Sequence, residues 1–230
     1  MNRPILILHG WGTSGKKYNE LQKLLEAKKF KVFSPDLPGF GSESLKKDMT
    51  LSDYAEFVRS YLKKKRIEKP IIIAHSFGSR VAAKLAVESP DFIHKLVITG
   101  SPLIRQPLSV RKKVFSLVAR IGKGITPSFA RESLRKVLYR GVGEVDYLKA
   151  GKLSETFKNV VNEDLKNILH KISAPTLIVW GKNDTFVPLR VGKNIAEKIK
   201  SSTLKVVDGT HKLPYENPKL FFETIFPFIK

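Results

Sequence analysis

Six short apolar runs recur along the chain, and amphipathic stretches with helical spacing separate most of them. The runs occupy residues 5–8, 31–33, 71–73, 95–98, 176–180 and 203–207. Most of them lack the alternation of apolar and polar residues that marks a half-exposed strand, which favours parallel strands covered on both faces. Strand–helix alternation of this kind predicts an α/β fold with a doubly wound, mostly parallel sheet of six strands.

Two helix starts carry recognisable capping residues. Thr50 and Asp53 fit a capping box, in which side chain and backbone exchange hydrogen bonds, ahead of a helical pattern at 51–62. Asn217 followed by Pro218 resembles an N-cap with proline at the first helical position. Helices are therefore expected to begin at these two places, and further helical patterns occupy 18–25 and 80–88.

One interval breaks the strand–helix alternation. Between residue 102 and about residue 171 there is no strand signal, and helical patterns are interrupted by Gly and Pro. Connections in compact domains ordinarily span about 2–6 residues, so this interval is too long for a simple loop. It predicts a helical lid at 102–171, inserted into an α/β core formed by 1–101 and 172–230.

Composition excludes several classes of protein. The chain has 230 residues, of which 42% are hydrophobic, enough for a packed core and too many for a disordered chain. It has no Cys, which excludes a disulfide scaffold, a thiol nucleophile and Cys-ligated metals. The apolar run at 5–8 is too short for a signal peptide, which needs roughly 7–15 apolar residues, or for a spanning helix, which needs about 20. We therefore expect a soluble, cytoplasmic protein without a transmembrane segment.

The segment after the third run is typical of a nucleophile turn. Ser76 follows the apolar run 71–73 and precedes a helical pattern, with the small residues Ala74 and Gly78 two positions to either side. Such a turn holds the serine in a strained backbone conformation and projects its hydroxyl out of the sheet, and only small neighbours allow strand and helix to approach so closely. A serine at an ordinary strand-to-helix turn is the alternative interpretation.

A serine hydroxyl needs a base to remove its proton, and the base in turn needs a carboxylate to orient it. The chain has five histidines: His9, His75, His94, His170 and His211. His211 follows the last run, at the sheet edge where ligands bind in open α/β folds. Asp184 follows the fifth run at the same edge, and Asp208 is its nearest rival. The expected catalytic set is Ser76, Asp184 and His211.

Catalysis by such a serine also needs N–H donors for the negative charge that develops on the attacked carbonyl oxygen. Phe77, directly after the serine, supplies one backbone N–H. Trp11, in the glycine-rich segment 9–12 after the first run, is the candidate for the second. The side chains of these two residues are also expected to bind substrate, with the Trp11 indole forming a wall of the acyl pocket.

Taken together, these motifs resemble the α/β-hydrolase superfamily. The resemblance rests on five segments in the family's order: 9–12 (HGWG), 36–42 (DLPGFGS), 74–78 (AHSFG), 180–184 (WGKND) and 209–211 (GTH). Within the superfamily, the first two segments look like the small serine carboxylesterases that include pimeloyl-acyl-carrier-protein methyl ester esterase. Ala74 stands where the family usually has Gly, and the family's leading hairpin is missing. Ser76 disfavours the dehalogenase and epoxide-hydrolase branches, which carry Asp at this position.

The resemblance implies a serine hydrolase that cleaves a carboxylic ester or thioester through an acyl-enzyme intermediate. No metal or organic cofactor is needed for this chemistry. Two alternatives stay open: a C–C bond hydrolase of the same fold, which uses the same residues, and a non-catalytic ligand-binding protein that retains the hydrolase fold.

Positive charge is concentrated at the start of the expected lid. The net charge of the whole chain is +21. The candidate residues for docking an anionic partner are Arg105, Arg111, Arg131, Arg135 and Arg140. Arginine matches the geometry of phosphate and carboxylate, so an acidic acyl carrier protein or a coenzyme A thioester would fit. A solvated basic helix surface and binding to anionic lipid are the alternatives. No nucleic-acid recognition motif is present, so specific nucleic-acid binding is not expected.

Overall fold

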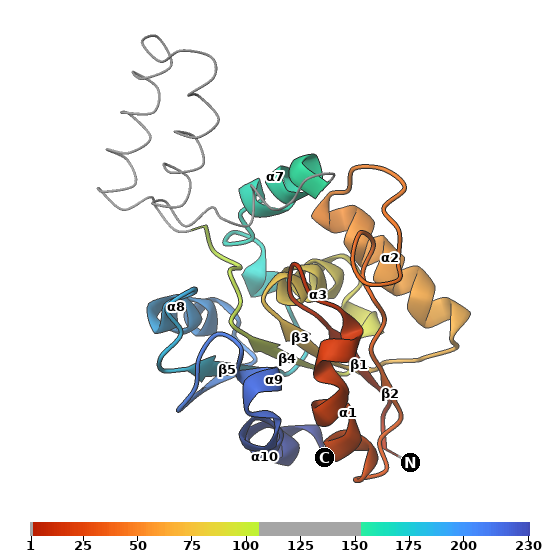
Figure 1. Ribbon diagram of the computed structural model, residues 1–230. Helices are drawn as coiled ribbons and strands as arrows, with labels where there is room; N and C mark the ends of the chain where they lie inside the picture. The colour runs from red at the N-terminus through yellow and green to blue at the C-terminus, as the bar shows by residue number, and fades with distance from the viewer. Residues whose placement is uncertain (1, 106–152) are drawn as a thin grey trace, which may run out of the picture. The chain divides into compact units, whose positions relative to one another are not determined.

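The computed structural model describes residues 2–105 and 153–230, which contain one six-stranded sheet (Figure 1). The strands are β1 (Ile5–Leu8), β2 (Val32–Phe33), β3 (Ile71–His75), β4 (Lys95–Thr99), β5 (Thr176–Gly181) and β6 (Ser202–Val207). Their order is β2-β1-β3-β4-β5-β6, and every pair of neighbours is parallel. All six predicted strands are present: β1 has the predicted ends, and the other five differ by one or two residues at an end.

Helices cover both faces of the sheet, as a doubly wound fold requires (Figure 1). They are η1 (Gly15–Tyr18), α1 (Asn19–Glu26), α2 (Leu51–Lys64), α3 (Phe77–Glu88), η2 (Pro90–Phe92), η4 (Leu169–Lys171), α8 (Leu189–Lys198), α9 (Leu213–Glu216) and α10 (Pro218–Ile229). Successive side chains of a strand point to opposite faces, so alternate residues serve two cores. On one face, Ile5, Ile7 and Ile73 pack with apolar residues of α1 and α10. On the other, α8 lies against the ring of Trp180 through Gly192, and α2 packs on α3.

The strand order reverses direction between β1 and β3. From β1 the chain moves outward to β2, and it then returns to the other side of β1 to form β3. In open α/β sheets, ligands bind outside the carboxyl ends of the strands at such a reversal. Ser76 follows β3 and Trp11 follows β1, so both candidate residues stand at this reversal.

Both expected helix caps are present. Thr50 Oγ1 accepts the Asp53 N–H at 3.2 Å, and the Asp53 carboxylate accepts the Thr50 N–H at 2.9 Å, which confirms the capping box. At the start of α10, Asn217 Oδ1 accepts the Leu220 N–H at 3.2 Å, with Pro218 as the first helical residue. The hydrogen bonds that Asp53 accepts lower its pKa to about 2.

The chain divides into two compact units, residues 1–105 with 163–230 and residues 106–162. Of the second unit the structure describes α7 (Ser154–Asn162). The expected lid at 102–171 therefore falls mostly outside the described residues, and its helical character there stays a prediction. Residues 163–171, placed in the lid by the sequence, group with the sheet.

A buried arginine holds the two ends of this insertion together. Arg80 of α3 donates hydrogen bonds to the carbonyl oxygens of Pro102 and Glu163. Beside it, the Leu165 N–H donates to Leu103 O at 3.2 Å, and Lys84 forms an ion pair with Glu163 at 2.7 Å. The chain thus leaves the core and returns to it at one place, on the helix that begins at the serine turn.

Within the described ranges, 2–105 and 153–230, no helix combines the length and the apolar character needed to cross a membrane.

The capping box gives a direct test of what the start of α2 contributes. Thr50→Ala removes the hydroxyl that accepts the Asp53 N–H, and loss of such a cap typically costs about 1 kcal/mol. Urea unfolding should show a decrease of this size in the free energy of unfolding. Thr50→Ser keeps the hydroxyl and should stay close to wild type, whereas equal losses in the two variants would contradict the capping role.

Candidate active site

Ser76 occupies a strained turn between β3 and α3. Its φ of 52° and ψ of −113° lie outside the regions that a residue with a side chain ordinarily adopts. Gly78 allows this turn to pack against β1, because a Cβ at that position would lie 2.3 Å from Leu8 O. Ala74, which replaces the family's usual Gly, is fully buried and pairs with both neighbouring strands.

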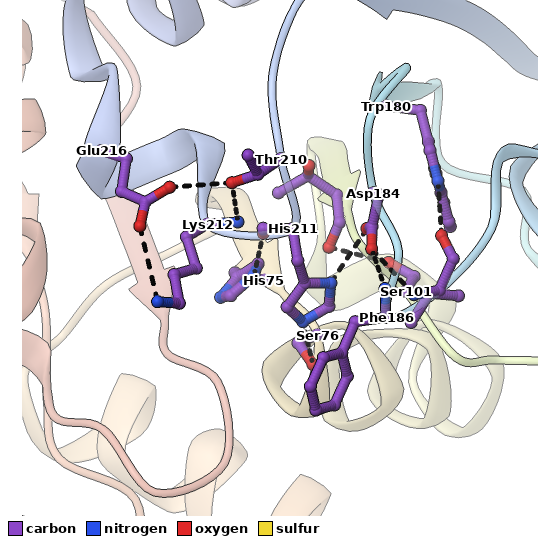
Figure 2. Close-up of polar contacts among 12 residues, drawn as sticks. His75, Ser76, Ser101, Trp180, Asp184, Phe186, Thr210, His211, Lys212 and Glu216 are labelled. Atoms are coloured by element: carbon purple, nitrogen blue, oxygen red, sulfur yellow. Dashed lines mark hydrogen bonds and ion pairs between the residues drawn. The ribbon is translucent and has the colours of Figure 1, made fainter. Parts of the chain in front are cut away.

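The structure brings Ser76, His211 and Asp184 into one hydrogen-bonded series (Figure 2). His211 Nε2 lies 3.2 Å from Ser76 Oγ, and His211 Nδ1 lies 2.9 Å from Asp184 Oδ2. A carboxylate can only accept, so Nδ1 carries the proton and Nε2 is left to accept the hydroxyl proton of Ser76. Residues separated by 135 positions along the chain therefore meet in the orientation that proton transfer needs.

Asp184 has the surroundings expected of an orienting carboxylate, and its rival Asp208 does not. The Asp184 side chain is 1% exposed, and its Oδ1 accepts the N–H groups of Phe186 and Val187 at 2.9 and 2.8 Å. These bonds fix one oxygen and leave the other directed at His211. Asp208 is 71% exposed and instead accepts a hydrogen bond from Asn183 at 2.9 Å.

The loops that carry the acid and the histidine are joined through their backbones. The Lys182 N–H donates to Val207 O at 2.9 Å, and the Asn183 N–H donates to Gly209 O at 3.0 Å. These bonds extend the pairing of β5 and β6 beyond the ends of the strands. The distance between Asp184 and His211 is therefore set by the sheet itself.

The imidazole of His211 is enclosed by three residues from different elements. The ring of Phe186 stacks on it with 5.2 Å between centroids, although Phe186 is 66% exposed. The ring of His75 lies 4.9 Å away, at a tilt of 54°. Gly100, with a φ of +56°, lies so close that a Cβ there would be 2.9 Å from His211 Nδ1. These contacts restrict the rotation of the imidazole.

Trp11 and Phe77, the expected charge-stabilising and substrate-binding residues, lie together beside Ser76. Their rings meet edge to face with 5.1 Å between centroids, and Phe40 packs against both. Phe77 is buried and also contacts Tyr54, whereas Trp11 is partly exposed. The rings of Trp11, Phe40 and Phe77 therefore form one aromatic wall, which joins the loop after β1 to the start of α3.

The loop after β1 is held in shape by polar contacts from the loop after β2. The Leu37 N–H donates to His9 Nε2 at 2.9 Å, so the His9 ring is neutral with its proton on Nδ1, which faces Gly10 O at 2.8 Å. Burial lowers the pKa of His9 and favours this neutral form. Asp36 accepts the Gly15 N–H at 2.8 Å, which ties the far end of the loop.

The remaining candidates lie away from the serine or outside the described residues. His94 follows η2, before β4, and His170 is exposed in η4. Arg105 is exposed, and its backbone N–H donates to Asp164 Oδ1 at 3.3 Å. The other docking candidates, Arg111, Arg131, Arg135 and Arg140, lie outside the described residues. In the part of the chain that is described, no group of three or more His, Asp or Glu side chains could hold a metal ion.

Four further residues of this site have no role that the sequence pattern predicts. His75, Tyr18, Phe186 and Gly100 contact the catalytic candidates or their neighbours. Tyr18 begins the helical pattern at 18–25, and no motif of the sequence indicates that Phe186 contacts His211. The one available signal was the place of His75 directly before Ser76.

A parallel sheet with a strained serine after its third strand, and a histidine and a carboxylate at the same edge, defines the α/β-hydrolase class. A family model described as "alpha/beta hydrolase fold" matches residues 3–121, and the chain belongs to this family.

Similar proteins agree with the family. "Putative esterase/lipase 2" of Mycoplasma genitalium is 26% identical over 241 residues, which cover 97% of this chain and 88% of that protein. An esterase from Exiguobacterium antarcticum has a similar solved structure, with a TM-score of 0.76, 19% identity, and coverage of 99% and 92%. A bromoperoxidase from Bacillus anthracis also has a TM-score of 0.76, at 21% identity, with coverage of 100% and 92%. The structural likeness shows the fold, and the family and its esterase/lipase relative support a hydrolase.

The buried His75 predicts how stability depends on pH. Burial and the nearby His211 lower the pKa of His75 from 6.5 to about 3. Below pH 6.5 the unfolded chain takes up a proton at this residue and the folded protein does not. The free energy of unfolding therefore decreases as the pH is lowered from 6.5 to about 3. At about pH 5 this should cost the folded state about 2 kcal/mol, at about 1.4 kcal/mol per pKa unit.

Urea unfolding at about pH 7.5 and about pH 5 checks this, with His75→Gln as the variant that cannot titrate. The wild type should lose about 2 kcal/mol more than the variant between the two conditions. If both lose the same free energy, His75 is not held neutral in the fold.

Proposed function

We propose that the protein is a serine hydrolase that cleaves a carboxylic ester or thioester through an acyl-enzyme intermediate. Ser76 is the nucleophile, His211 the base and Asp184 the orienting carboxylate. One observation carries the proposal: the continuous series of hydrogen bonds from Ser76 Oγ through His211 to the buried Asp184. The strained backbone of Ser76, a conformation kept at functional sites, supports it independently.

In the proposed reaction, Ser76 Oγ attacks the substrate carbonyl carbon while His211 Nε2 takes the hydroxyl proton. The protonated imidazole, stabilised by Asp184, then gives this proton to the departing alcohol or thiol. Water next attacks the acyl-enzyme and gives a proton to Nε2, after which Ser76 Oγ leaves with that proton and the acid is released. Every proton passes through Nε2, and this is why the tautomer set by Asp184 matters.

The backbone N–H groups of Phe77 and Trp11 are proposed to donate hydrogen bonds that stabilise the negative charge on the carbonyl oxygen. Phe77 opens α3, where the helix dipole adds positive potential. Trp11 lies in the loop after β1, held in place by His9. Each such donor is worth on the order of 10²–10³ in rate. The aromatic wall of Trp11, Phe40 and Phe77 is proposed to bind the acyl group.

The proposed substrate is a small-molecule or carrier-bound acyl ester. Within the expected lid, the residues that form a compact unit of their own, 106–162, are proposed to act as the lid. Docking of an acidic carrier on Arg105, Arg111, Arg131, Arg135 and Arg140 is supported by the charge pattern of the sequence. Esterase/lipase naming of a relative supports ester substrates.

Ser76→Ala should abolish hydrolysis of p-nitrophenyl butyrate, because no other group in the series can form the acyl-enzyme. Ser79→Ala, one turn further along α3, removes a hydroxyl that donates to Ala74 O and should retain turnover. The wild type should also react with a fluorophosphonate probe. Unchanged turnover in Ser76→Ala would end the proposal, and a wild type that neither hydrolyses esters nor reacts with the probe would indicate a ligand-binding protein instead.

Asp184→Asn and Asp208→Asn form a matched pair that tests the assignment of the acid. An amide at position 184 donates to His211 Nδ1 and so favours the wrong tautomer, which should lower kcat by on the order of 10³–10⁴. Asp208→Asn changes an exposed carboxylate and should leave kcat within about twofold of wild type. The reverse pattern, measured with the same ester, would transfer the role to Asp208.

A further inference from the structure

A buried chain of hydrogen bonds links Gly10, Tyr18, His75 and the backbone of His211, next to the proposed catalytic residues. The Gly10 N–H donates to Tyr18 Oη at 3.3 Å, Tyr18 Oη lies 2.7 Å from His75 Nδ1, and His75 Nε2 lies 2.8 Å from the carbonyl oxygen of His211. Tyr18 is 1% exposed and His75 is 3% exposed. Figure 2 shows His75 directed at the backbone of His211, to one side of the imidazole. The chain thus joins the loop after β1, the serine turn and the loop after β6.

The acceptors fix the direction of each bond. His211 O can only accept, so His75 carries its proton on Nε2, and Nδ1 accepts the Tyr18 O–H. The Tyr18 oxygen in turn accepts the Gly10 N–H. In these directions the three bonds require a neutral His75, because Nδ1 can accept the Tyr18 O–H only when it carries no proton. The titratable groups that act on it are Tyr18, Tyr215, His9, His211 and Asp184, and burial, the largest influence, lowers its pKa to about 3.

We propose that Tyr18 and His75 are positioning residues for the hydrolysis proposed above: they anchor the backbone of His211, and with it the loop of Trp11, to the turn of Ser76. This inference rests on the proposed function, because it assigns a role within that site. The hydrogen bonds of the two side chains reach the backbone of His211 and of Gly10, not Ser76 Oγ. Both act through His211 and Gly10.

The position of β6 explains why His211 needs such an anchor. β6 is the last strand of the sheet order and pairs with β5 alone. His211 therefore follows an edge strand, whereas Ser76 follows a central one. The bond from His75 to His211 O connects the edge loop directly to the residue before the nucleophile. Displacement of a catalytic group by about 1 Å can cost on the order of 10² in rate.

The same series of hydrogen bonds also positions the loop after β1, which carries Trp11. A Cβ on Gly10 would lie 3.0 Å from His75 Nδ1 and 3.5 Å from Ser76 Cβ, so the loop after β1 rests on both residues. Trp11 is the next residue, and its N–H is a proposed donor to the carbonyl oxygen. His75 and Tyr18 therefore hold the proton acceptor and a charge-stabilising donor in a fixed relation to one nucleophile.

Variants at position 75 separate positioning from packing. His75→Gln retains an amide N–H that can donate to His211 O, while His75→Leu is of similar size and cannot. With p-nitrophenyl butyrate, His75→Leu should lower kcat by about 10²-fold with KM within about twofold of wild type. His75→Gln should recover about 10-fold of that loss, and Tyr18→Phe should lower kcat by several-fold, about 3–10. A purely structural role predicts no such rescue by Gln and no selective effect on kcat.

Tyr215→Phe is the matched control. Tyr215 contacts the rings of both Tyr18 and His75, at 5.6 and 5.8 Å between centroids. The substitution therefore changes a tyrosine of the same cluster that takes no part in the series of hydrogen bonds from Gly10 to His211. It should keep kcat within about twofold of wild type. The inference is overturned if His75→Leu retains wild-type kcat, or if Gln and Leu are equally impaired while both remain folded by urea unfolding.

A measurement on the wild type decides the matter where variants do not fold. In ¹⁵N-histidine NMR spectra, His75 should be neutral with its proton on Nε2 throughout the range from about pH 5 to about pH 8. A proton on Nδ1, or titration near pH 6.5, would overturn the inference. This result does not depend on activity, so an inactive wild type would refute the proposed function, whereas an active one with the wrong tautomer would refute only the positioning role.

Discussion

The hydrogen bond between Asp184 and His211 Nδ1 is the interaction on which the rest of the site depends. It fixes the proton on one nitrogen of the imidazole and leaves the other nitrogen to face Ser76. The carboxylate is held in place for this bond, because Asp184 is almost wholly buried and its second oxygen accepts two backbone N–H groups. A carboxylate that could rotate or exchange with water would orient the imidazole less firmly.

The sheet supplies the frame in which this bond forms. Ser76, Asp184 and His211 follow β3, β5 and β6, whose carboxyl ends share one edge because all neighbouring strands are parallel. Backbone bonds beyond the strand ends join the loops of Asp184 and His211. Such a frame can sustain the backbone strain at Ser76, a cost of order 1–3 kcal/mol that the surrounding fold must offset.

Much of this architecture could be predicted from the sequence, because it depends on local patterns. Apolar runs gave all six strands, and Thr50 and Asn217 marked helix starts through contacts within four residues. The meeting of Ser76, Asp184 and His211 was predictable because each lies within four residues of the end of a parallel strand. The bond from Tyr18 to His75 joins residues 57 positions apart on different elements, and the closeness of Gly100 to His211 depends on β4 packing beside a loop after β6. No short-range pattern encodes either contact.

The hydrogen bonds of Arg80 have a consequence for how the length and sequence of the insertion can change. Arg80 donates hydrogen bonds to the carbonyl groups of Pro102 and Glu163, which lie on either side of the insertion. The two ends of the insertion are therefore held close together. A segment bounded in this way can lengthen, shorten or be exchanged at little entropic cost, since closing a loop whose ends already meet depends only weakly on its length. Changes of length and sequence between these two margins can therefore be accommodated while the contacts among Ser76, His211 and Asp184 stay as they are.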